Sequence, residues 1–130
     1  MRLSEAILLG SVGTGQAFGK LNDGQGNTCA YGSALAAEGI QVTIYRAFEI
    51  PTIIPLEWAW AFKISSKACC PAEDCNSFDL HSGGPCINII IGLNDRHKWS
   101  RPRIAEWVAQ EEVRLGIVSK RIEEVCYAIK

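Results

Sequence analysis

The chain has 130 residues, of which 48% are hydrophobic and 21% charged, and its formal net charge is −1. This length and composition predict one globular domain over residues 1–130 and exclude a disordered chain. The near-neutral charge also excludes a protein that overall basicity draws to nucleic acid or to an anionic membrane.

The apolar stretches bear on where the protein resides. The N-terminal run Ala6–Leu9 is shorter than the roughly 7–15 apolar residues of a signal peptide. Other apolar runs fall below the ~18 residues that a membrane helix needs. We therefore expect a soluble cytoplasmic protein, in which the six cysteines are reduced thiols or metal ligands rather than disulfides.

Two helices are predicted in the first third of the chain. Ser4 is a candidate N-cap for a short helix over about 4–12, which several glycines then interrupt. Asn27 or Thr28 is a candidate cap for a second helix, which Gly39 ends. Most residues of this second helix are small, which predicts a central helix that a neighbour approaches closely.

The middle of the chain has patterns typical of strands. Ile40–Ile44 and Trp58–Ile64 alternate apolar and polar or small residues, and this period of two indicates a strand. A helix beginning after Pro55 also fits the second of these segments. The run Ile87–Ile91 indicates a buried strand.

Two further helices are predicted at the C-terminal end. Ser100 is the N-cap of a helix to about Leu115, and a last helix covers about 119–129. Together these elements predict an α+β fold, with terminal helices packed on a small central sheet and a cysteine-rich loop between them.

The segment Gly10–Ala17 has the glycine spacing of a phosphate-binding loop. That chemistry requires a lysine on the phosphates and a hydroxyl on magnesium, but Gln16 and Ala17 occupy those positions. We therefore expect a turn-rich connector that binds no nucleotide.

The cysteine-rich loop contains candidate zinc ligands. Cys70 and Cys75 form a C-x4-C pair, Cys86 follows, and either Cys69 or His81 is the fourth candidate. Structural zinc sites close four such ligands around the metal in a tetrahedron. The alternative is a loop with free thiols or one disulfide.

The stretch 93–108 combines aromatic and basic residues. Its part from Ser100 to Val108 resembles the second helix of helix-turn-helix proteins of the transposase and resolvase type, which enters the major groove. Lys98 stands where the turn of that motif usually has glycine. Residues 104–115 carry three glutamates against one arginine, which favours a packing helix over a DNA reader. We interpret His97 as packing a turn beside Trp99.

The whole chain also resembles a group of small uncharacterised bacterial and phage-borne proteins. The shared features are the helix Leu3–Ile7, the helix start Thr28–Ala30, the loop from Cys69 and the segment Leu93–Trp99 before the last main helix. The resemblance implies a shared fold and transfers no functional residue.

Three functions follow in order of preference. The first is a non-catalytic binding or adaptor module of unknown ligand, with a structural zinc as an option and a protein as a candidate partner. The second is a DNA-binding regulator that uses residues 100–115. The third is an enzyme with an unplaced cysteine or metal site, for which the sequence identifies no catalytic residue.

Overall fold

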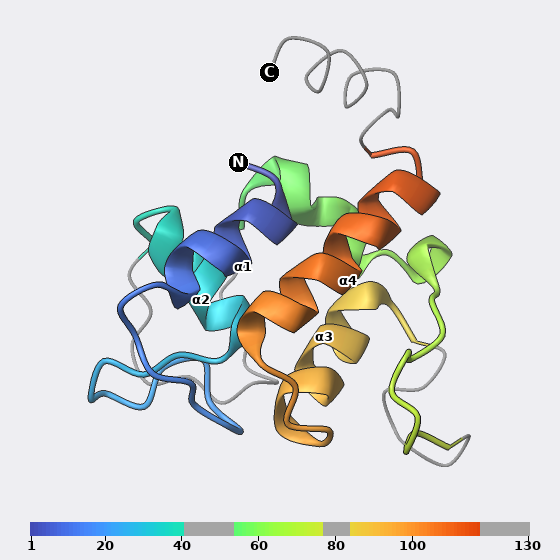
Figure 1. The fold of residues 1–130 in the computed structure, drawn as a ribbon. Helices are drawn as coiled ribbons and strands as arrows, with labels where there is room; N and C mark the ends of the chain where they lie inside the picture. The colour runs from blue at the N-terminus through green and yellow to red at the C-terminus, as the bar shows by residue number, and fades with distance from the viewer. Residues whose placement is uncertain (41–53, 77–83, 118–130) are drawn as a thin grey trace, which may run out of the picture.

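The computed structural model describes residues 1–40, 54–76 and 84–117. The predicted helix 119–129, most of the predicted strand Ile40–Ile44, and His81 lie outside the described residues. The elements of the described part are the α-helices α1 (Leu3–Ser11), α2 (Ala30–Ala37), α3 (Cys86–Asp95) and α4 (Arg101–Arg114), and the 3-10 helices η1 (Leu56–Phe62) and η2 (Ile64–Ser66). Figure 1 shows α1 beside both α2 and α4, with α3 on the other side of α4.

The prediction of an α+β fold with a central sheet is wrong. The described residues form helices and two isolated bridges, with no strand among them. None of the described helices has the length and apolar character needed to cross a membrane.

The segment Trp58–Ile64, predicted as a strand, is mainly the 3-10 helix η1. Trp58, Trp60 and Ala61 are buried, and Ile64 is 75% exposed although a strand would have buried it. Because a 3-10 turn has three residues, the buried positions fall two and three residues apart, which imitates alternation at this length. The alternative of a helix after Pro55 is the one that the structure supports.

The isoleucine run Ile87–Ile91, predicted as a strand, lies in α3. β-branched residues favour strands, but burial decides here. Cys86, Ile89, Ile90 and Leu93 are buried at helical spacing, and Asn88 is exposed.

Helix α4 confirms the predicted helix from Ser100. The Ser100 side chain is the N-cap and accepts a hydrogen bond from the backbone N–H of Arg103. Ile104, Trp107 and Val108 are buried, as the sequence predicted.

The predicted caps of the first two helices are wrong, because the capping side chains have other partners. Ser4 lies inside α1, and its side chain bonds to Glu112 of α4. In α2 the N-cap is Cys29, whose sulfur accepts from the Gly32 N–H, while the Thr28 hydroxyl pairs with Ser33.

Close backbone approach joins α1 to α2. A Cβ added at Gly10 would lie 1.8 Å from the carbonyl oxygen of Ser33, and one at Gly32 would lie 1.9 Å from that of Leu21. The small residues of α2 therefore allow this packing, which confirms the prediction of a close neighbour.

The glycine-rich connector is tied down by one buried arginine. Arg101 is 6% exposed, and its guanidinium donates to the Thr14 hydroxyl at 2.8 Å, the Thr28 hydroxyl at 3.0 Å and the Ser33 hydroxyl at 3.0 Å. It also donates to the carbonyl oxygens of Thr14 and Ser11. The connector thus folds around the positively charged side chain of Arg101.

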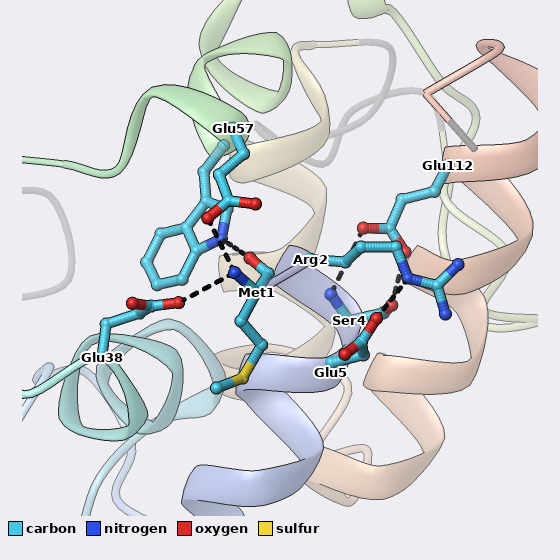
Figure 2. Close-up of polar contacts among 8 residues, drawn as sticks. Met1, Arg2, Ser4, Glu5, Glu38, Glu57 and Glu112 are labelled. Carbon is cyan, nitrogen blue, oxygen red and sulfur yellow. Dashed lines mark hydrogen bonds and ion pairs between the residues drawn. The ribbon is translucent and has the colours of Figure 1, made fainter.

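Figure 2 shows the polar contacts at the start of α1. The Met1 amine lies 2.7 Å from Glu57 Oε1 and 3.3 Å from Glu38 Oε1, so that charges join this end of α1 to η1 and α2. Ser4 donates to Glu112 from its hydroxyl and, at 3.4 Å, from its backbone N–H.

Glu112 is fully buried, and burial raises the pKa of its carboxyl above the ordinary 4.5, although the Ser4 hydrogen bonds oppose the shift. A raised native pKa adds stability that is complete below the unfolded pKa and is lost as the pH rises through the native pKa. We expect the unfolding free energy of the wild type, relative to Glu112→Gln, to fall as pH rises from about 4 to 7. Urea titrations over this range test the sign. Glu106→Gln, an exposed change on the same helix, is the control. If the unfolding free energy of the wild type relative to Glu112→Gln rises with pH over this range, the expectation is contradicted.

Candidate metal site

The cysteine loop follows η2 and has little regular structure of its own. Ala68 and Ala72 are buried and anchor it to the core. The Cys75 N–H donates to the Ala72 carbonyl at 3.1 Å, which closes a turn over residues 73 and 74. This turn brings the chain back, so that the half-buried Cys70 and Cys75 lie near one another.

The link between α3 and α4 places His97 opposite this loop. The His97 N–H donates to the Gly92 carbonyl at 3.1 Å, and the Trp99 N–H donates to the Leu93 carbonyl at 2.9 Å. Between them Lys98 has a φ of 58°, a left-handed conformation that usually belongs to glycine. The compact link leaves the His97 side chain with no exposed surface.

Three side chains of the described residues form a group with metal-ligand chemistry. One ligand atom each of Cys70, Cys75 and His97 lies within 4.8 Å of the other two. Zinc takes sulfur at ≈ 2.3 Å and imidazole nitrogen at ≈ 2.0–2.1 Å, so neighbouring ligand atoms in a tetrahedral site are about 3.5–3.8 Å apart. The ligand atoms of this group need to move closer by about 1.3 Å at most to meet that geometry.

A carboxylate lies beside the histidine of this group. Asp74 Oδ1 is 2.7 Å from Nδ1 of His97, and Asp74 Oδ2 is 3.9 Å from a guanidinium nitrogen of Arg96. The contact with His97 is the main cause that lowers the pKa of Asp74. Asp74 therefore presents a negative charge to the histidine.

The structure separates Cys86 and Cys69, two of the other predicted ligands, from this group. Cys86 is buried in α3, and its thiol donates to the Ser66 carbonyl at 3.2 Å. Burial raises the pKa of Cys86 to about 11, which disfavours the thiolate that a metal needs. Cys69 is exposed and lines a hollow with Lys67 and Arg114.

His81 is the one predicted ligand that lies outside the described residues. His97, which we interpreted as a packing residue, joins the cysteines instead. His97 is far from Cys75 along the chain, so sequence spacing did not identify it as a ligand. The one available signal was that His97 is one of only two histidines.

Comparison of the chain with protein-family models, curated proteins and solved structures gave no match.

Proposed function

We propose that the protein is a non-catalytic binding module whose cysteine loop is held by one structural zinc ion. The observation that carries the proposal is the convergence of Cys70, Cys75 and His97 from two distant parts of the chain. Two thiols and an imidazole are ligands that zinc favours, and a reducing cytoplasm keeps such thiols free to bind it.

The location of the group supports a structural role. Residues 67–76 form turns and irregular backbone, whereas His97 lies in the short link between α3 and α4. A metal bound to both would crosslink the loop to the helices and restrict the unfolded chain over residues 70–97. Metal binding would therefore contribute directly to folding.

A tetrahedral site also needs a fourth ligand. His81 and Cys69 were the candidates from the sequence, and Cys69 lies against Lys67 and Arg114 rather than with Cys70 and Cys75. We propose His81 or a water molecule as the fourth ligand.

Protein purified under reducing conditions without chelator is expected to contain about one zinc per chain. Cys70→Ser and Cys75→Ser should lose the metal, because each removes a thiolate ligand. Cys69→Ser is a matched control, since it replaces the adjacent, exposed cysteine, and it should keep the zinc. Elemental analysis gives the stoichiometry, and melting with and without chelator should show a lower melting temperature once zinc is removed.

Two results would contradict the proposal. One is a Cys70–Cys75 disulfide in the purified protein. The other is a reduced protein that takes up no added zinc and whose melting temperature does not respond to it.

Exposed apolar side chains on α1 and at its C-cap support a protein partner. Leu8, Leu9 and Val12 are 50%, 55% and 74% exposed, although large apolar side chains are usually buried. Leu8 also lines a groove between α1 and α4, together with Pro102 and Ala105. Clustered apolar surface of this kind is typical of protein-binding sites.

Against the DNA-binding alternative, we propose that α4 packs on the core and does not read DNA. The Arg101 guanidinium is buried among hydroxyls and carbonyls, and Arg103 lies over the Trp99 ring at 3.7 Å. The exposed face of α4 mixes both charges, with Arg103, Glu106, Gln110 and Arg114. Phosphate contacts supply much of the affinity for DNA, and this face offers few.

We therefore expect no DNA binding tighter than ~10⁻⁶ M at physiological salt, the strong end of non-specific affinity. Titration with a mixed-sequence duplex pool at two salt concentrations measures it. Tighter binding that weakens steeply with salt, and that Arg103→Ala with Lys98→Ala abolishes, would support the regulator instead. Lys98 and Arg103 suit this test because both are exposed, whereas a change at the buried Arg101 is expected to destabilise the fold.

A further inference from the structure

Asp74 lies beside the cysteine and histidine group, and the proposed zinc site leaves its role open. It belongs to the turn that brings Cys75 towards Cys70, and it faces His97 from the cysteine loop. Its carboxylate oxygen lies 2.7 Å from Nδ1 of His97, which is ion-pair contact distance. Its other oxygen lies 3.9 Å from Arg96, so that the carboxylate is held between two groups of the α3–α4 link.

The two nitrogens of a neutral imidazole have different roles. One carries the proton and the other has the lone pair that binds a metal, and the partner of the protonated nitrogen decides which is which. A carboxylate accepts hydrogen bonds and does not donate them. The contact with Asp74 therefore favours the proton on Nδ1 and leaves the lone pair on Nε2.

We infer that Asp74 is a positioning residue for zinc, which holds the His97 imidazole in the tautomer that binds the metal through Nε2. This inference rests on the proposed function. Carboxylates that accept from a metal-bound histidine fix its ring orientation and raise the basicity of its ligating nitrogen. The same turn of the chain thus supplies a ligand, Cys75, and the group that orients the ligand opposite it.

The zinc affinity of the full chain tests this, with Asp74→Ala compared against Glu73→Ala. Glu73 is the preceding residue of the same turn and is also exposed, so the control removes an equal charge at an adjacent position. Competition of zinc with a chromophoric chelator at fixed pH should show an affinity about 10–100-fold lower for Asp74→Ala. Glu73→Ala should stay within about twofold of the wild type, because losing one exposed charge has little effect on a buried ligand.

A second measurement separates orientation from general stability. Histidine-selective ¹⁵N NMR of the zinc-loaded wild type should show His97 protonated at Nδ1 and bound to zinc at Nε2. Asp74→Asn keeps an acceptor oxygen and should retain this pattern with an intermediate affinity. Zinc bound at Nδ1, or equal affinities for Asp74→Ala and Glu73→Ala, would overturn the inference while the zinc site itself stands. A wild type that binds no zinc would overturn both.

Discussion

Replacing Arg101 with methionine is expected to lower the free energy of unfolding by about 3–5 kcal/mol. The arginine side chain is buried, and its guanidinium donates to hydroxyls of Thr14, Thr28 and Ser33 and to the carbonyls of Ser11 and Thr14. Methionine has no donor, so these acceptors would stay buried without their partner. A buried acceptor that loses its partner costs about 1–3 kcal/mol.

Urea denaturation of both proteins measures the loss. Arg103→Met is the matched control, because it makes the same change two residues along α4 at an exposed position. Its side chain stacks on Trp99, a contact worth about 0.5–1 kcal/mol at an exposed site. Equal losses for the two variants would show that the polar contacts of Arg101 do not stabilise the fold.

Gly10→Ala is the second change with a large expected effect, a loss of about 1–3 kcal/mol. The new Cβ would lie 1.8 Å from the Ser33 carbonyl oxygen, and further Ser33 backbone atoms lie within 3 Å of it. A backbone cannot turn aside as a side chain can, so α1 and α2 would have to separate. Alanine regains only about 1 kcal/mol through its higher helix propensity.

Thermal and urea unfolding of Gly10→Ala should therefore show a clear loss of stability. Leu9→Ala is the control on the same helix, since Leu9 is 55% exposed and its truncation should change stability by less than about 0.5 kcal/mol. A neutral or stabilised Gly10→Ala would mean that α1 and α2 are farther apart in solution.

The helices that the sequence predicted well are those with local signals. For α4, Ser100 followed by Pro102 and a period of 3.6 defined both the start and the buried face. The middle of the fold was predicted wrongly because its local signals contradict its packing. The isoleucines of α3 favour a strand, and only the neighbouring helices make a buried helical face the better solution.

Two of the three residues of the candidate site could be predicted from local signals in the same way. The Cys70–Cys75 pair is a local pattern, so spacing predicted it. His97 joins that pair through tertiary structure, across α3 and the link that follows, and no spacing within the chain encodes this approach. Likewise, Cys86 has a suitable position in the sequence, but α3 directs its thiol to the Ser66 carbonyl.

The contacts of Arg101 also affect how the protein opens. Glycine-rich connectors usually fluctuate apart from the helices that they join and open at little cost. Here α4 holds the connector between α1 and α2 through the Thr14 and Ser11 carbonyls, while Gln16 donates to Asn94 of α3 and to the Trp99 carbonyl. Opening the connector therefore breaks bonds to two helices from the other half of the chain. We therefore expect residues 10–17 to open together with the core rather than separately from it.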